Sequence, residues 1–88
     1  MATNTNVVAV EIAPLGGATN AGLKLGFIES AAKSAQNDTW TVTNAKAIKC
    51  IIPIDDSDGL LGIPTISTNV VTLTSASTGA ASALIVYR

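Results

Sequence analysis

The fold is decided by residues 44–54, which read NAKAIKCIIPI, and by the turn DDSDG that follows at residues 55–59. This block is the densest group of β-branched apolar residues in the chain. β-Branched side chains favour an extended backbone, and Asp, Ser and Gly favour turns. We therefore predict that residues 45–54 form the central strand of a small all-β domain.

The alternation along this strand predicts which of its side chains are buried. Successive side chains on a strand point to opposite faces, and the face that carries Ile48, Cys50, Ile52 and Ile54 is the more apolar of the two. We expect this face to lie in the core. Pro53 has no backbone N–H, so we expect the strand to be irregular there or to lie at an edge of its sheet.

Other segments on both sides of this block also have the composition of strands. Residues 29–36 are rich in Ala but too short for a stable isolated helix, so we predict strand and loop there, with one helical turn as the alternative. The last two strands are predicted to form a hairpin with a long loop. The predicted strands flanking the central block are residues 7–12, 23–28, 38–43, 70–74 and 83–87.

About six or seven short strands, with turn signals about every eight to twelve residues, are typical of a β-sandwich or barrel. We predict a single small antiparallel domain of this kind over residues 7–88, preceded by a flexible N-terminal arm at residues 1–6. Trp40, the only tryptophan, is expected to anchor the core or an interface. The predicted core comprises Trp40, Val42, Ile48, Cys50, Ile52, Ile54, Leu73 and Ile85.

The composition favours a protein that assembles with other chains. Charged residues make up 12% of the 88 residues and hydrophobic residues 48%, whereas a charged share of about 25% is typical. A small domain usually needs disulfides, a metal or association for its stability. Cys50 is the only cysteine and the chain has no histidine, so no disulfide can form within it and a structural zinc site is not expected. Association is the remaining means of stabilisation.

Several function classes lack the residues that they need. The net charge is −1 and the five basic residues are scattered, which argues against nucleic-acid binding. We expect no signal peptide, no membrane span and no cofactor. Without histidine, an activated thiol partner or a phosphate-binding glycine loop, we expect no enzymatic activity.

The acidic turn at residues 55–59 invites comparison with a calcium-binding loop, but the spacing differs. The calcium pattern D-x-[DN]-x-[DN]-G would place an acid where Ile54 stands and a Glu where Thr65 stands. We therefore predict an acidic surface turn and no metal site. A weak cation site shared between subunits stays open as an alternative.

Two regions are the predicted contacts with partner chains. An exposed loop with large aliphatic residues is a natural contact surface, and an extended N-terminal arm can add a strand to a neighbouring sheet. The predicted contact residues are Ala2, Thr3, Asn4, Thr5 and Asn6 in the arm, and Leu60, Leu61 and Ile63 in the loop.

Residues 23–88 resemble small β-sandwich virion proteins of tailed phages, including head-decoration proteins. The similarity lies in the order of a DTWTV strand at residues 38–42, a central strand ending in an Asp-Gly turn, an NVVTLT strand at residues 69–74, a Thr-Gly loop and a terminal aliphatic strand. It implies a non-enzymatic virion protein that assembles on a capsid or tail, often as an oligomer. No family motif assigns particular contact residues.

The first functional hypothesis is accordingly a capsid decoration or cement subunit that binds the major capsid protein and sister copies, located in the virion after assembly in the host cytoplasm. The second is a self-assembling extracellular filament or surface-layer subunit, which needs open-ended contacts. The third is a small ligand-binding β module, for which three aromatic residues give little support.

Overall fold

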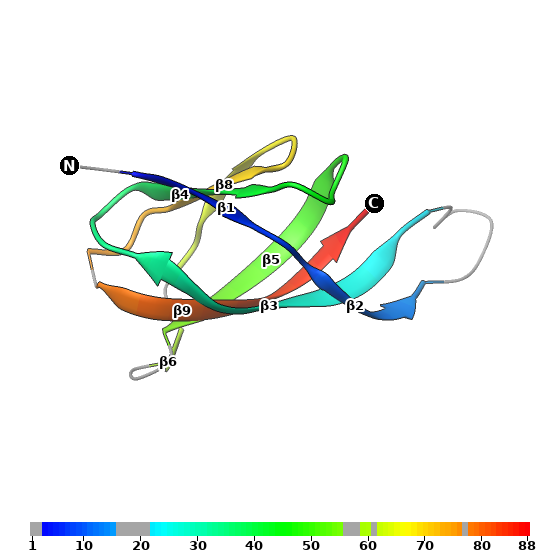
Figure 1. Ribbon diagram of the computed structural model, residues 1–88, viewed down its shortest axis with the longest axis horizontal. Coiled ribbons are helices and arrows are strands. Elements are labelled where there is room, and N and C mark those ends of the chain that lie inside the picture. The colour runs from blue at the N-terminus through cyan, green and yellow to red at the C-terminus, as the bar shows by residue number, and fades with distance from the viewer. Residues whose placement is uncertain (1–2, 16–21, 56–58, 61, 77) are drawn as a thin grey trace.

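The computed structural model describes residues 3–15, 22–55, 59–60, 62–76 and 78–88. These residues form two sheets packed face to face (Figure 1). The four-stranded sheet has the order β1-β4-β8-β7 and the five-stranded sheet has the order β2-β3-β9-β5-β6. The strands are β1 (Asn4–Val7), β2 (Val10–Pro14), β3 (Lys24–Lys33), β4 (Asp38–Val42), β5 (Ile48–Asp55), β6 (Gly59–Leu60), β7 (Thr65–Ser67), β8 (Val70–Leu73) and β9 (Gly79–Tyr87).

The predicted fold class is confirmed. All strand pairs are antiparallel except β1 with β4, which is parallel, and the described residues contain no helix. The segment after Ile28 continues as strand to Lys33, with a register shift between Ile28 and Ala31. Its pairing with β9 therefore outweighs its helix-favouring composition.

The N-terminal segment differs from the prediction in two ways. Residues 4–6 belong to β1, which pairs with β4 from Asn4 opposite Thr39 to Val7 opposite Val42, so a flexible arm is wrong for them. Residues 7–12 do not form one strand, because the chain crosses from one sheet to the other between β1 and β2 (Figure 1). The side-chain amide of Asn44 holds this crossing: it accepts from the N–H of Ala9 at 3.0 Å and donates to its carbonyl at 2.7 Å.

The predicted hairpin between the last two predicted strands, at residues 70–74 and 83–87, is also wrong. β8 pairs with β4 and β7 in one sheet, whereas β9 pairs with β3 and β5 in the other. β9 is thus the centre of the five-stranded sheet. The block predicted as the central strand corresponds to β5, which lies between β9 and the edge strand β6. β6 pairs with β5 only at Ile54 and Asp55. The prediction of an edge position around Pro53 is therefore confirmed over the described residues.

Three of the predicted core residues do not lie in the core. Ile48 is opposite Tyr87 and Cys50 is opposite the next residue of β9, Val86. β5 therefore contains a bulge, in which the one residue between Ile48 and Cys50 has no partner on β9. A shift of one residue moves every later side chain to the other face. Ile51 and Pro53 are consequently buried, while Cys50 and Ile52 are exposed and Ile54 is half-buried.

The other predicted core residues are confirmed. The side chains of Trp40 and Val42 are fully buried between the sheets. The Trp40 indole N–H donates to the carbonyl of Ala32 at 3.0 Å, so the polar atom of the anchor has a partner. The remaining predicted residues with buried side chains are Ile48, Leu73 and Ile85.

Candidate interaction surface

The most unusual surface of the molecule is the outer side of the five-stranded sheet. The register places Val10 beside Phe27, Phe27 beside Leu84, and Leu84 beside Ile52. Directly paired residues of neighbouring strands point to the same face, so these four side chains form one row across β2, β3, β9 and β5. Val10, Ile52 and Leu84 are 66%, 48% and 38% exposed.

A second apolar row runs beside the first. It consists of Ala13, Leu25, Val86 and Cys50, on the same four strands. Ile54, two positions beyond Ile52, extends the surface along β5. We call these nine residues the apolar face: Val10, Ala13, Leu25, Phe27, Cys50, Ile52, Ile54, Leu84 and Val86.

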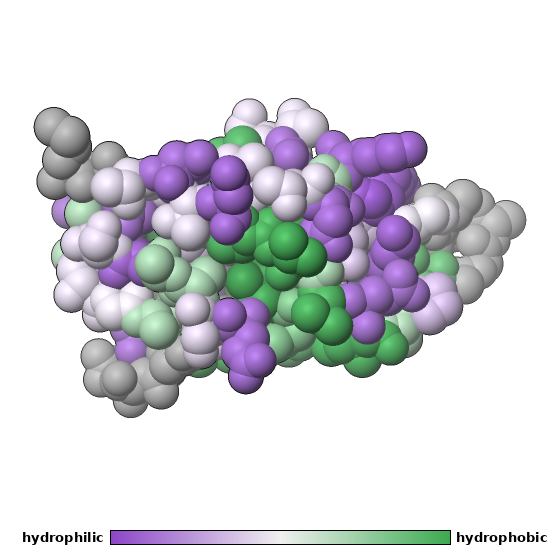
Figure 2. Space-filling model, in the orientation of Figure 1, coloured by the Kyte–Doolittle hydropathy of each residue, from purple (hydrophilic) through white to green (hydrophobic). Residues whose placement is uncertain are grey.

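The apolar face lies opposite the core side of the same sheet. Along β9, Ala83, Ile85 and Tyr87 are buried between the sheets, and Leu84 and Val86 alternate with them on the outside. An antiparallel sheet with one side in water usually carries polar side chains on that side, and a sheet that is apolar on both sides is typically covered on both. Figure 2 shows apolar side chains gathered in the middle and lower part of the molecule, over the course of β1 into β2.

The predicted contact regions lie elsewhere. Asn4 and Asn6 are exposed on β1, at the edge of the four-stranded sheet, and the Asn4 side-chain oxygen accepts from the hydroxyls of Thr39 and Thr41. Thr3 is exposed and Thr5 is half-buried. Ile63 is 87% exposed in the segment between β6 and β7.

The rest of the predicted contact loop is only partly described. The backbone of Leu60 pairs with Ile54, and Ala2 and Leu61 lie outside the described residues. Over the described residues the arm belongs to the four-stranded sheet, whereas the loop is joined to the five-stranded sheet through the pairing of Leu60 with Ile54.

The Asp38 side chain accepts four hydrogen bonds, and its partners indicate a structural role. One oxygen of its buried carboxylate accepts from the N–H of Thr3 at 2.7 Å. The other accepts from the N–H groups of Ser34 and Ala35 at 2.6 and 3.0 Å, and from the Ser34 hydroxyl at 3.1 Å. The N–H of Thr3, followed by those of Ser34 and Ala35, holds the pKa of Asp38 well below its usual value of 3.8 against the opposing effect of burial.

Tyr87 and Gly26 form a close contact inside the sandwich. Burial, with a smaller contribution from the negative charge of Glu11, raises the pKa of the Tyr87 hydroxyl. The Lys24 ammonium lies 5.6 Å from the centre of the Tyr87 ring, within the range of a cation–π contact.

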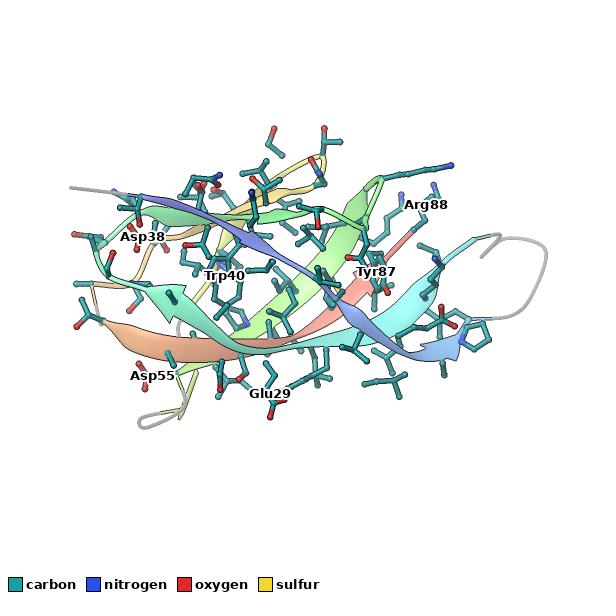
Figure 3. All side chains as sticks on the ribbon, in the orientation of Figure 1. Glu29, Asp38, Trp40, Asp55, Tyr87 and Arg88 are labelled. Carbon is teal, nitrogen blue, oxygen red and sulfur yellow. The ribbon has the colours of Figure 1, made fainter. Side chains whose placement is uncertain are left out.

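A β-carbon on Gly26 would lie 2.7 Å from the Tyr87 ring, so only glycine leaves room for the ring here. Figure 3 shows Tyr87 inside the fold and Glu29 on the outer side of the five-stranded sheet.

A shallow groove of about 540 Å³ lies between the end of β3 and the start of β9. The buried Lys33 ammonium at its wall donates to the carbonyls of Ala35 and Ser75 at 3.1 and 2.6 Å. These contacts hold the loop after β8 against β3. The groove is lined by Ser30, Ala32, Lys33, Ser34, Thr78, Gly79 and Ala80.

Within the described ranges, no three Cys, Asp or Glu side chains gather as metal ligands. Asp55 is buried at the end of β5, while residues 56–58 of the acidic turn lie outside the described part of the chain. Cys50 is exposed on the apolar face. The same described ranges contain no helix long and apolar enough to cross a membrane.

Comparisons of the chain with protein-family models, with curated proteins and with solved structures gave no match.

Proposed function

We propose that this protein is a non-enzymatic structural subunit of a virion, a capsid decoration or cement protein that binds the major capsid shell and sister copies. The observation that supports this role is the apolar face: two adjacent rows of uncharged side chains cover the outer side of a sheet whose inner side is already the core. Contiguous exposed apolar surface of this kind marks protein–protein contact sites.

In this role the protein acts by burying surface, not by chemistry. Phe27 and Leu84 occupy the two inner strands of the apolar face, so a partner that covers it removes their side chains from water most completely. Residues at the centre of an interface contribute most of its binding energy. The rigid sandwich behind the face keeps these side chains in place before binding, which lowers the entropic cost of association.

Immunoelectron microscopy with an antibody against the purified chain tests this proposal. The samples are the particles and surface structures released by the cells that produce the protein. Gold label on phage capsids, lost in a Leu84→Lys variant that still folds, is the expected result. Label confined to the soluble fraction would contradict a structural role of any kind.

A filament or surface-layer subunit is the second candidate, and the open edge of β5 favours it. β6 pairs with β5 only at Ile54 and Asp55, and the N–H of Ile48 donates to the carbonyl of Thr68 at 2.8 Å. Among the described residues, 49–53 therefore have a strand partner only in β9. An open edge can accept a strand from a neighbouring chain. Filaments seen by electron microscopy of the concentrated purified protein, with gold label on cell-surface fibres, would support this candidate over capsid decoration.

A further inference from the structure

We propose that the apolar face binds the same face of a second copy of this chain, in a two-fold dimer that stacks the two five-stranded sheets against each other. This inference rests on the proposed structural role and specifies one contact within it. The dimer would contain four sheets in layers, with the two five-stranded sheets in the middle and a four-stranded sheet on each outside.

The molecule is large enough on this side for a dimer contact. The whole molecule measures 41 × 22 × 19 Å, so one of its long sides outlines about 800 Å², of which the outer side of the five-stranded sheet is a part. A standard protein–protein interface buries about 800 Å² on each partner. The nine apolar side chains occupy the middle of this surface, where a stable interface has its dry centre.

The absence of charge on the apolar face favours a second copy as the occupant. None of its nine residues is charged, so pairing the face with itself buries no unpaired charge. The net charge of −1 adds little repulsion between copies. A charged partner surface would instead leave its own ionic groups without counter-charges in this contact.

Glu29 indicates the relative orientation of the copies. It is exposed on β3 beyond Phe27, at one end of the apolar face, and points away from the sandwich (Figure 3). When β3 of one copy runs antiparallel to β3 of the other, the two Glu29 carboxylates lie at opposite ends of the interface. Stacked sheets pack about 10 Å apart with their strands about 30° from alignment, which allows the half-exposed aliphatic side chains of the two faces to interdigitate.

The experiment is sedimentation equilibrium of the wild type and three variants from micromolar to millimolar concentration. Leu84→Lys and Val10→Lys each place a charge on the apolar face. Two such variants are made so that the test can still be carried out if one of them does not fold. Ile63→Lys is the control, since it makes the same change at an apolar side chain that is 87% exposed and outside the face. Near-ultraviolet circular dichroism from the buried Trp40 verifies folding of each variant.

We expect the wild type and Ile63→Lys to dimerise with dissociation constants within about threefold of each other, and both face variants to weaken dimerisation by about 100-fold or more. A second readout is the reaction of Cys50 with a maleimide, which dimerisation should slow in the wild type but not in the face variants. A wild type that stays monomeric at millimolar concentration, or face variants that dimerise like the control, would overturn the inference.

These outcomes separate the inference from the proposed function. A monomeric wild type that labels capsids, with label lost in Leu84→Lys, would retain the structural role and assign the apolar face to a different protein. A dimer broken by the face variants, with no label on any particle, would retain the dimer and reject the virion role.

Discussion

The carboxylate of Asp38 joins the segment before β1 to the loop between β3 and β4. Thr3 lies before β1, Ser34 and Ala35 lie in the loop after β3, and Asp38 itself begins β4. Since three backbone N–H groups donate to it, the charged form is strongly favoured in the folded protein. The pKa is therefore lower in the folded than in the unfolded state, and the resulting stabilisation is present above about pH 4 and declines as the pH falls below that value.

The substitution Asp38→Asn should lower the melting temperature at pH 7 by more than about 5 °C, because an amide oxygen cannot accept from all of these donors. The difference from the wild type should narrow between pH 5 and pH 2, as the wild type loses the contribution of the carboxylate. Thermal denaturation at a series of pH values measures both effects. Glu29→Gln, at an exposed position, is the control. An unchanged difference between the proteins over this pH range would disprove the assigned role.

Gly26 is a second position where one residue controls the packing. A β-carbon there would lie 2.7 Å from the Tyr87 ring and 2.9 Å from the Val10 carbonyl oxygen. Gly26→Ala should therefore destabilise the fold by about 1–3 kcal/mol, the usual cost of overpacking a core. Urea denaturation measures this cost, with Ala80→Ser on exposed β9 surface as the control. A variant as stable as the wild type would show that the ring has free space to move.

At the scale of elements, β1 connects the N-terminal segment to the core instead of leaving it free. It pairs in parallel with β4, and the Val7 carbonyl accepts from the N–H of Thr43 at 3.0 Å. Removal of residues 1–7 would expose the edge of β4, where Trp40 and Val42 are fully buried.

We expect this deletion to cost more than about 3 kcal/mol, since it removes a whole strand and uncovers part of the core. A chain that retains Thr3 and all later residues is the control. Urea denaturation followed by Trp40 fluorescence gives the comparison. Equal stability of the two truncated chains would restore the flexible-arm interpretation.

The strands were largely predictable from the sequence, but the faces of β5 were not. β-Branched runs and turn residues locate β3, β4, β5, β8 and β9. The bulge at Ile48–Cys50 has no marker in the sequence, and it moves Cys50, Ile52 and Ile54 out of the core and Ile51 into it. The false hairpin has a similar origin, because neighbouring strands in the sequence often but not always pair.

The apolar face was only partly predictable. The low share of charged residues already implied that some apolar surface is exposed. Its location depends on the alignment of four strands, which brings together Val10, Phe27, Leu84 and Ile52 from distant parts of the chain. Alternation within any single strand does not show which side is the outer one. The aliphatic loop was therefore predicted as the contact surface instead.

At the scale of the whole molecule, association through the apolar face should be insensitive to ionic strength. The face carries no charge, so adding sodium chloride has no ion pair there to screen. Sulfate should strengthen dimerisation, because it favours the burial of apolar surface. Sedimentation equilibrium in the two salts measures this response, and Ile63→Lys should respond like the wild type. Dissociation of the wild type in sodium chloride would instead indicate an ionic contact.

The central place of β9 in its sheet has a consequence for the timing of assembly in the cell. β3 and β5 are both made before β9, yet each finds its main partner only in β9. A nascent chain on the ribosome therefore cannot present the two rows of the apolar face until its last described strand has been synthesised. Until then the edges of β3 and β5 that later pair with β9 stay open, and unpaired strand edges of this kind promote contacts between neighbouring nascent chains on one messenger RNA.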